Sequence, residues 1–134
     1  MTKAELLTKW PILLKIPIEH GPGWYGVLDN MLTAMQNAGF DPLRDQITQV
    51  KEKFGCIKLY IEFDPSIDGG QSRFGRVHQA MRHADKSART CEVCGDAAHL
   101  MVTNIPPGCR DSVICVLCVK REKYLFLQKE YFLP

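Results

Sequence analysis

The sequence predicts an α+β fold: N-terminal helices with a β-hairpin, then a long basic helix and a C-terminal module built on four cysteines. Three observations predict it: apolar residues at helical spacing from residue 24, alternating apolar residues from residue 57, and two Cys-x-x-Cys pairs near the C-terminal end. We divide the chain into residues 1–68, a helix and hairpin core, and residues 69–134, the remainder. Both parts are expected to form one compact unit.

The first helix is expected to begin at Thr2. Thr2 and Glu5 have the spacing of a capping box, in which each side chain accepts a hydrogen bond from a backbone amide at the helix start. Pro11 ends or kinks this helix because proline cannot donate the next helical hydrogen bond. Residues 12–18 are apolar and interrupted by proline, so they are expected to pack on the core as an irregular segment.

A second helix follows a turn at residues 20–23. Its C-terminal end is marked by Gly39, a natural cap. One face of this helix is apolar and is made of Trp24, Val27, Leu28, Met31, Leu32, Met35 and Ala38.

A β-hairpin is expected next. Residues 57–63 alternate between apolar and polar side chains, as in a strand with one buried face. Residues 47–53 are its expected partner, with the turn at Phe54-Gly55. The run of aspartate, proline and glycine in residues 64–70 predicts a loop.

A third helix is expected over about residues 72–87. Its apolar stripe is made of Phe74, Val77, Met81, Ala84 and Ala88. Its basic residues are candidates for contact with phosphate or with an acidic protein, and basic residues near the C-terminal end extend the set. The candidates are Arg73, Arg76, Arg82, Lys86, Arg89, Lys120, Arg121 and Lys123. The alternative is an ordinary solvated face, because a helix with one apolar stripe exposes charges elsewhere.

The cysteine pairs are the strongest chemical signal. Cys91 and Cys94 form one Cys-x-x-Cys motif, Cys115 and Cys118 form another, and twenty residues separate the two. Two such turns supply four thiolates, the ligand set of a structural Zn2+ site. An iron–sulfur cluster, which also uses four cysteines, is the alternative. The order of the motifs predicts a treble-clef or zinc-ribbon-like module, with the first pair on a knuckle and the second opening a terminal helix over residues 119–131.

The remaining cysteines and His99 are weaker candidates for ligands. Cys56 is expected to act as a small hydrophobe in a strand, and Cys109 is an alternative ligand that the symmetry of the two pairs disfavours. His99 is expected beside the site or in solvent. The cysteine pairs with His99 are superficially similar to HNH-type nucleases, but Ala98 stands where that family has an acid. Four protein ligands also leave no open position on the metal, so we predict no enzyme.

Charge and composition narrow the possible partners and the location of the protein only in part. The formal charge of +2 falls to about zero once four thiolates and one Zn2+ are counted, so it does not argue for nucleic acid. No apolar run approaches the ~18–20 residues that span a bilayer, and the N-terminus lacks the features of a secretion signal. We therefore expect a cytoplasmic protein with no membrane partner. The apolar segment 124–134 is expected to pack on the core, with a homodimer interface as the alternative.

Three motifs together resemble a family of small uncharacterised proteins from bacteriophages and prophages. The motifs lie at residues 19–25 (Glu-His-Gly-Pro-Gly-Trp-Tyr), residues 49–60 (beginning Gln-Val-Lys-Glu-Lys-Phe-Gly) and residues 87–95, which contain the first cysteine pair. The chain departs from the family at Cys56, where glycine is frequent, and at Val119, where histidine is common. The resemblance implies a phage-borne accessory protein in the cytoplasm of a bacterial host.

These features lead to one functional expectation and two alternatives. We expect a zinc-binding protein that acts stoichiometrically and without catalysis on host machinery, such as a CRISPR-type defence complex or the transcription apparatus. The first alternative is direct binding of DNA or RNA through the basic helix. The second is a divergent HNH-type nuclease.

Overall fold

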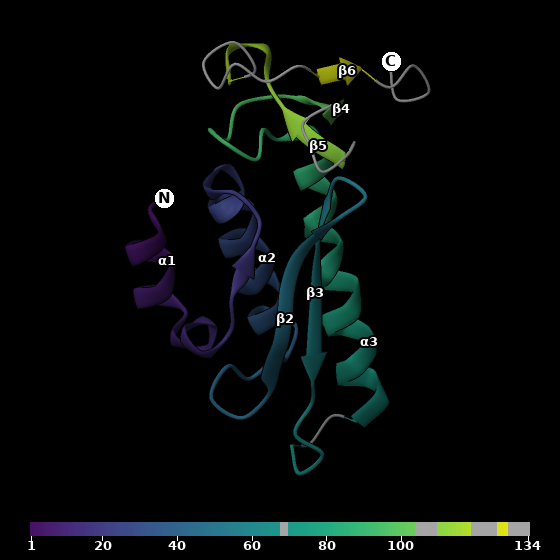
Figure 1. The fold of residues 1–134 in the computed structure, drawn as a ribbon. Coiled ribbons are helices and arrows are strands. Elements are labelled where there is room, and N and C mark those ends of the chain that lie inside the picture. The colour runs from purple at the N-terminus through teal and green to yellow at the C-terminus, as the bar shows by residue number, and fades with distance from the viewer. Residues whose placement is uncertain (68–69, 104–109, 119–125, 129–134) are drawn as a thin grey trace.

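A three-stranded sheet forms one layer of the fold, and helices pack against one of its faces (Figure 1). The computed structural model describes residues 1–67, 70–103, 110–118 and 126–128. The sheet has the strand order β1-β2-β3, with β1 parallel to β2 and β2 antiparallel to β3. Its strands are β1 (Ile18–Glu19), β2 (Gln46–Lys53) and β3 (Cys56–Glu62). The α+β class and the predicted hairpin are thus confirmed.

The N-terminal helix α1 (Lys3–Lys9) has the predicted capping box. The Glu5 amide donates to Thr2 Oγ1 at 3.1 Å, and the Thr2 amide donates to Glu5 Oε1 at 3.2 Å. A 3-10 helix, η1 (Pro11–Lys15), follows directly where an irregular segment was expected. The Trp10 indole between them donates to Asp29 Oδ1 at 2.8 Å and so fastens this corner to the next helix.

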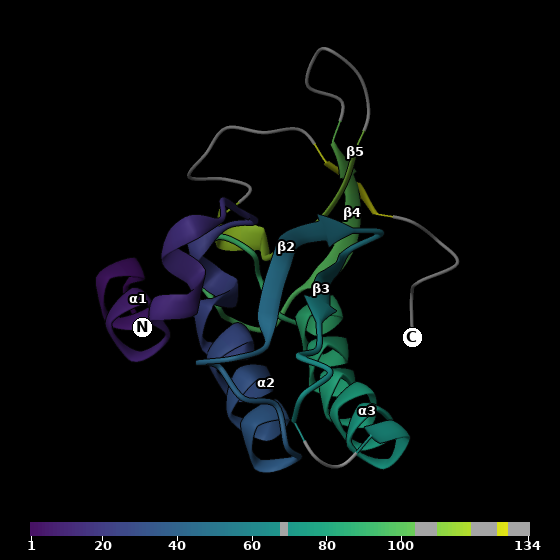
Figure 2. The same ribbon diagram turned by 90° about the horizontal axis from the view of Figure 1, so that it is seen from below.

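Helix α2 (Tyr25–Asn37) follows a short 3-10 helix, η2 (Pro22–Trp24), and confirms the second predicted helix. Gly39 ends it with a φ of +115°, a left-handed conformation that glycine adopts without steric cost. Helix α3 (Gly70–Ala80) continues into a long 3-10 helix, η3 (Met81–Arg89). Figures 1 and 2 show α2 and α3 side by side on one face of the sheet.

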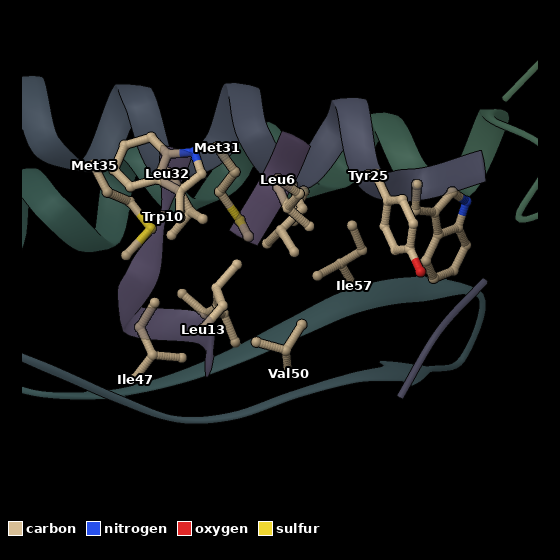
Figure 3. Packing of buried hydrophobic residues seen from close by; sticks show 14 of the residues in the cluster. Leu6, Trp10, Leu13, Tyr25, Met31, Leu32, Met35, Ile47, Val50 and Ile57 are labelled. Atoms are coloured by element: carbon tan, nitrogen blue, oxygen red, sulfur yellow. The ribbon is translucent and has the colours of Figure 1, made fainter. Parts of the chain in front are cut away.

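The main core fills the space between α2 and the sheet (Figure 3). The side chains labelled in Figure 3 come from α1, η1, α2, β2 and β3, and from Trp10 between α1 and η1. Fully buried members include Leu6, Leu13, Leu28, Met31, Leu32, Met35 and Val50. The same buried cluster reaches Cys91, Val113 and Cys118, so the cysteine region shares one hydrophobic core with the N-terminal helices.

The predicted apolar stripe on the third helix is wrong at one position. Val77 and Ala84 are buried, but the ring of Phe74 is 52% exposed and contacts the rings of Phe63 and His78. The adjacent Arg73 occupies the buried position instead. Its buried charge is paired with a carboxylate, which hydropathy spacing alone does not reveal.

A second sheet lies at the same end of the molecule as the β2–β3 turn (Figure 1). Its strand order is β5-β4-β6, and β4 is antiparallel to both neighbours. The strands are β4 (His99–Thr103), β5 (Arg110–Ile114) and β6 (Phe126–Gln128). The predicted terminal helix is therefore wrong at residues 126–128, which form a strand because pairing with β4 satisfies their backbone groups. The rest of that predicted helix, residues 119–125 and 129–131, lies outside the described residues.

None of the helices in the described residues combines the length and the apolarity that crossing a bilayer requires.

Candidate metal centre

Four cysteine side chains from two parts of the chain converge on one point. The sulfur atoms of Cys91, Cys94, Cys115 and Cys118 all lie within 4.8 Å of one another. The Cys94 and Cys115 sulfurs are 3.6 Å apart. Tetrahedral bonds of about 2.3 Å to one Zn2+ place sulfurs about 3.8 Å apart, so the cluster has the size of a single metal site. The cluster can hold a metal ion.

The sulfurs are not joined to one another. All four are free thiols, and a disulfide requires two sulfurs at about 2.05 Å, far closer than the 3.6 Å between Cys94 and Cys115. The arrangement therefore favours ligation over covalent pairing.

The first pair sits on a tight turn closed by its own backbone. The Gly95 amide donates to the Cys91 carbonyl at 2.9 Å, and the Cys91 amide donates to the Asp96 carbonyl at 2.6 Å. Gly95 has a φ of +87°, which a side chain would disfavour. A bridge between Thr90 and Ala97 closes the base of this knuckle. Both cysteines of the pair thus face the same point.

The second pair follows β5 immediately. Cys115 is the first residue after the strand, and residues 116–118 are helical. The Glu92 amide donates to the Val113 carbonyl at 2.8 Å, which ties the knuckle to β5. This bond brings the two cysteine pairs, distant in sequence, to one site.

The thiols differ in how readily they ionise. Burial raises the pKa of Cys91, but hydrogen bonds from the amides of Cys94, Cys115 and Val93 outweigh burial and lower that pKa to about 7. Burial and the neighbouring thiols raise the pKa of Cys118. The free site therefore resists carrying four thiolates at once, and a bound divalent cation would supply the compensating charge.

The turn before α2 is hydrogen-bonded to the segment that carries the first cysteine pair. The Gly23 amide donates to the Glu92 carbonyl at 2.7 Å, and the Gly21 amide donates to Glu92 Oε2 at 3.1 Å. The indole of Trp24, which is fully buried, donates to the Thr90 carbonyl at 2.7 Å. The Gly-Pro-Gly-Trp segment therefore supports the turn that carries Cys91 and Cys94.

The two glycines of this turn are needed for close approach. A Cβ atom on Gly23 would lie 2.0 Å from the Cys91 carbonyl oxygen and 2.6 Å from the Gly95 nitrogen. A Cβ on Gly21 would lie 2.4 Å from the Glu92 carbonyl oxygen. Sequence reasoning identified only a turn here. A glycine pair beside a buried tryptophan was the signal for backbone-to-backbone packing.

The predicted basic residues of the described helices differ in their exposure to solvent. Arg76, Arg82, Lys86 and Arg89 are exposed on α3 and η3. The expectation that Arg73 joins them is wrong, because Arg73 is only 5% exposed.

Arg73 pairs instead with the buried carboxylate of Asp45. The closest contact of this ion pair is 2.5 Å. Arg73 also donates to the carbonyls of Gly39 and Asp64 and stacks on the ring of Phe63, 4.5 Å from the centroid. It fastens the end of α2 to both strands of the hairpin.

The remaining candidates lie apart from the cysteines or beyond the described residues. His99 is exposed at the start of β4 and does not join the cluster of four cysteines. Cys56 is half-buried at the start of β3, and burial raises the pKa of its thiol. Cys109 lies outside the described residues, as do Lys120, Arg121 and Lys123.

Within the described ranges, the four cysteines are the one group of three or more metal-ligating side chains close enough to share an ion. Comparison of the chain with protein-family models, with curated proteins and with solved structures finds no significant match in any of the three. The function must therefore be inferred from the site and the surfaces around it.

Proposed function

We propose that the protein is a non-catalytic binding protein whose shape is fixed by structural Zn2+, and that it acts stoichiometrically on host nucleoprotein machinery. The convergence of four cysteine sulfurs carries the proposal. Catalytic zinc keeps a position open for water or substrate, whereas four thiolates fill a tetrahedral shell. The metal then stabilises the fold, and function belongs to the surfaces around it.

One such surface is the exposed side of η3. Arg82, Lys86 and Arg89 are solvent-exposed there, and none of them forms an ion pair within the described part of the chain. Cys91 follows this helix within two residues, so metal binding fixes its orientation. A rigid basic surface complements the acidic or phosphate-lined surfaces of nucleoprotein machines, in keeping with the phage setting that the resemblance implies.

A metal assay and a capture experiment test this proposal together. The purified protein should contain one Zn2+ per chain, and tagged protein should retain one host complex at a fixed molar ratio. Reversing the charges of Arg82, Lys86 and Arg89 should release the complex without unfolding the protein. The control reverses Lys3 and Lys15, which are also exposed, on α1 and η1, and should leave capture unchanged.

Direct binding of duplex DNA or RNA through η3 is the second candidate, favoured by the same three cations. A duplex binder loses affinity steeply as salt rises because it releases counterions. Salt-sensitive duplex binding without any retained protein partner would favour this candidate over the first. Nucleic-acid cleavage that needs an added divalent metal and is lost in His99→Ala would overturn both.

A further inference from the structure

The β2–β3 hairpin presents a second surface of defined chemistry, which we call the hairpin face. It consists of Lys51, Lys53, Phe54, Lys58 and Tyr60. Lys58 and Tyr60 alternate along β3 with the buried residues Ile57 and Leu59, and β3 packs against η3. The Lys51 ammonium lies 5.5 Å from the ring centroid of Tyr60, and the Lys53 ammonium lies 5.7 Å from that of Phe54. Cations and aromatic rings are therefore interleaved on this surface.

The charges on the hairpin face are not neutralised by the fold. Lys51 and Lys58 are directly opposite each other in the antiparallel pairing, an arrangement that disfavours strand pairing for like charges. On the neighbouring strand β1, Glu19 is in register with Lys51, yet no ion pair joins the two side chains. Glu52 is engaged elsewhere, because its Oε1 accepts the Gly55 amide at 2.8 Å. An anion at the Lys51–Lys58 pair would relieve the repulsion.

The aromatic residue at the hairpin turn is costly to the fold. Phe54 has a φ of +54° and Gly55 a φ of +78°, the left-handed pair of a type I′ turn. Asparagine, aspartate or glycine is favoured at the position of Phe54, and a bulky side chain is strained there. The ring gains little packing in return, since Phe54 is 75% exposed. A residue that strains its turn and gains little packing in return indicates a functional contact.

We propose that the hairpin face binds single-stranded nucleic acid, with bases stacked on Phe54 and Tyr60 and phosphates beside Lys51, Lys53 and Lys58. Bases of a single strand are free to stack on exposed rings, whereas those of a duplex are already stacked on each other. Lysines beside the rings match the phosphates that join stacked bases. The surface is a set of separated rings among cations, which suits a polyanion better than an apolar partner. This inference builds on the proposed binding function by naming a ligand class and a surface distinct from η3.

Fluorescence anisotropy with the zinc-loaded full chain tests the proposal. The probes are labelled oligo(U) and oligo(dT) of about ten nucleotides, which separate RNA from DNA, and a duplex of equal length. The single strands should bind more tightly than the duplex, with an affinity that falls as salt rises. Tyr60→Ala should weaken binding about 5- to 150-fold, the range for one base–ring stack. Lys51→Glu with Lys58→Glu should abolish binding.

A second variant separates binding from folding. Phe54→Asn places a favoured residue in the turn, so it should raise the unfolding midpoint while it weakens binding of the oligonucleotide. Phe74→Ala is the control, because Phe74 is also a half-exposed aromatic residue but lies on α3 outside the hairpin face. It should bind as the unmodified chain does.

Two results would overturn the proposal. The first is no binding of either single strand at low salt. The second is unchanged binding by Phe54→Asn and Tyr60→Ala while charge reversal at Arg82, Lys86 and Arg89 abolishes it. Either result leaves the proposed function standing if zinc and a host complex are still found. If only the hairpin variants lose oligonucleotide binding, the hairpin face is supported. If no host complex is captured in the same study, that result counts against the proposed function.

Discussion

Replacing Gly23 with alanine tests the contact between the Gly-Pro-Gly-Trp turn and the knuckle, the turn that carries Cys91 and Cys94. The new Cβ would lie 2.0 Å from the Cys91 carbonyl oxygen, whereas real Cβ contacts essentially never fall below 3.0 Å. The two segments must therefore separate by about 1 Å or more, which breaks the 2.7 Å hydrogen bond from the Gly23 amide to the Glu92 carbonyl. The bond from the Trp24 indole to the Thr90 carbonyl is strained by the same movement.

Each buried hydrogen bond that loses one partner costs about 1–3 kcal/mol. Gly23→Ala should therefore lower the free energy of unfolding by about 2–4 kcal/mol. Because the displaced carbonyl belongs to Cys91, one of the four clustered cysteines, the affinity for the proposed Zn2+ should fall as well. Urea unfolding followed by tryptophan fluorescence measures the first effect, and competition with a chromogenic chelator measures the second.

Gly26→Ala is the matched control. Apart from its chain neighbours and the backbone of its own helix, no atom lies within 4 Å of a Cβ built on Gly26, which is inside α2. Alanine is favoured over glycine in a helix by about 1 kcal/mol, so this variant should be as stable as the original chain or more so. If Gly23→Ala stays within about 0.5 kcal/mol of the original and binds Zn2+ equally well, the turn does not clamp the knuckle.

Three further predictions concern the buried ion pair and the metal. Arg73→Met leaves the Asp45 carboxylate buried without its partner, so urea unfolding should show a loss of about 3–5 kcal/mol, and a loss below 1 kcal/mol would contradict a structural role. Burial alone would raise the pKa of Asp45, but hydrogen bonds from Arg73 and from the amides of Asp41 and Asp64 lower it overall. The ionised carboxylate therefore contributes stability at neutral pH that is lost as the pH falls below about 4 towards the folded-state pKa. Urea midpoints of Asp45→Asn and of the original chain should be measured from pH 5 to pH 3. The midpoint of Asp45→Asn should be lower than that of the original chain at pH 5 and should change less with pH. Metal loss affects both proteins, so an equal pH dependence would refute this role for Asp45. Chelation of the metal should reduce the circular dichroism of the protein and abolish the hydrogen-exchange protection of β5 and of the turn that carries Cys91 and Cys94. Cys91→Ser should reproduce that loss. Protection unchanged by chelation would contradict a structural metal.

Local interactions made part of this fold predictable from sequence. The capping box joins Thr2 to Glu5, and the hairpin turn depends on Phe54 and Gly55, so each signal lies within a few residues. The spacing of the cysteines likewise indicated their convergence, because each pair fits one tight turn.

Contacts between distant segments were not predictable in the same way. Arg73 and Asp45 are separated by 28 positions, and hydropathy spacing treats each charge as exposed. The Trp24 indole reaches a carbonyl 66 positions away, so the sequence showed a turn but not what the turn grips. Strand β6 depends on pairing with β4, a partner that the local pattern of residues 126–128 does not specify.

Metal content, measured together with X-ray absorption at the metal edge, tests the closed structural zinc site most directly. We predict one zinc per chain with four sulfur neighbours at about 2.3 Å. Replacement of any one of the four clustered cysteines should reduce the sulfur count or empty the site. A metal-free folded protein, nitrogen or oxygen ligands in place of sulfur, or the spectrum of an iron–sulfur cluster would contradict a closed structural zinc site.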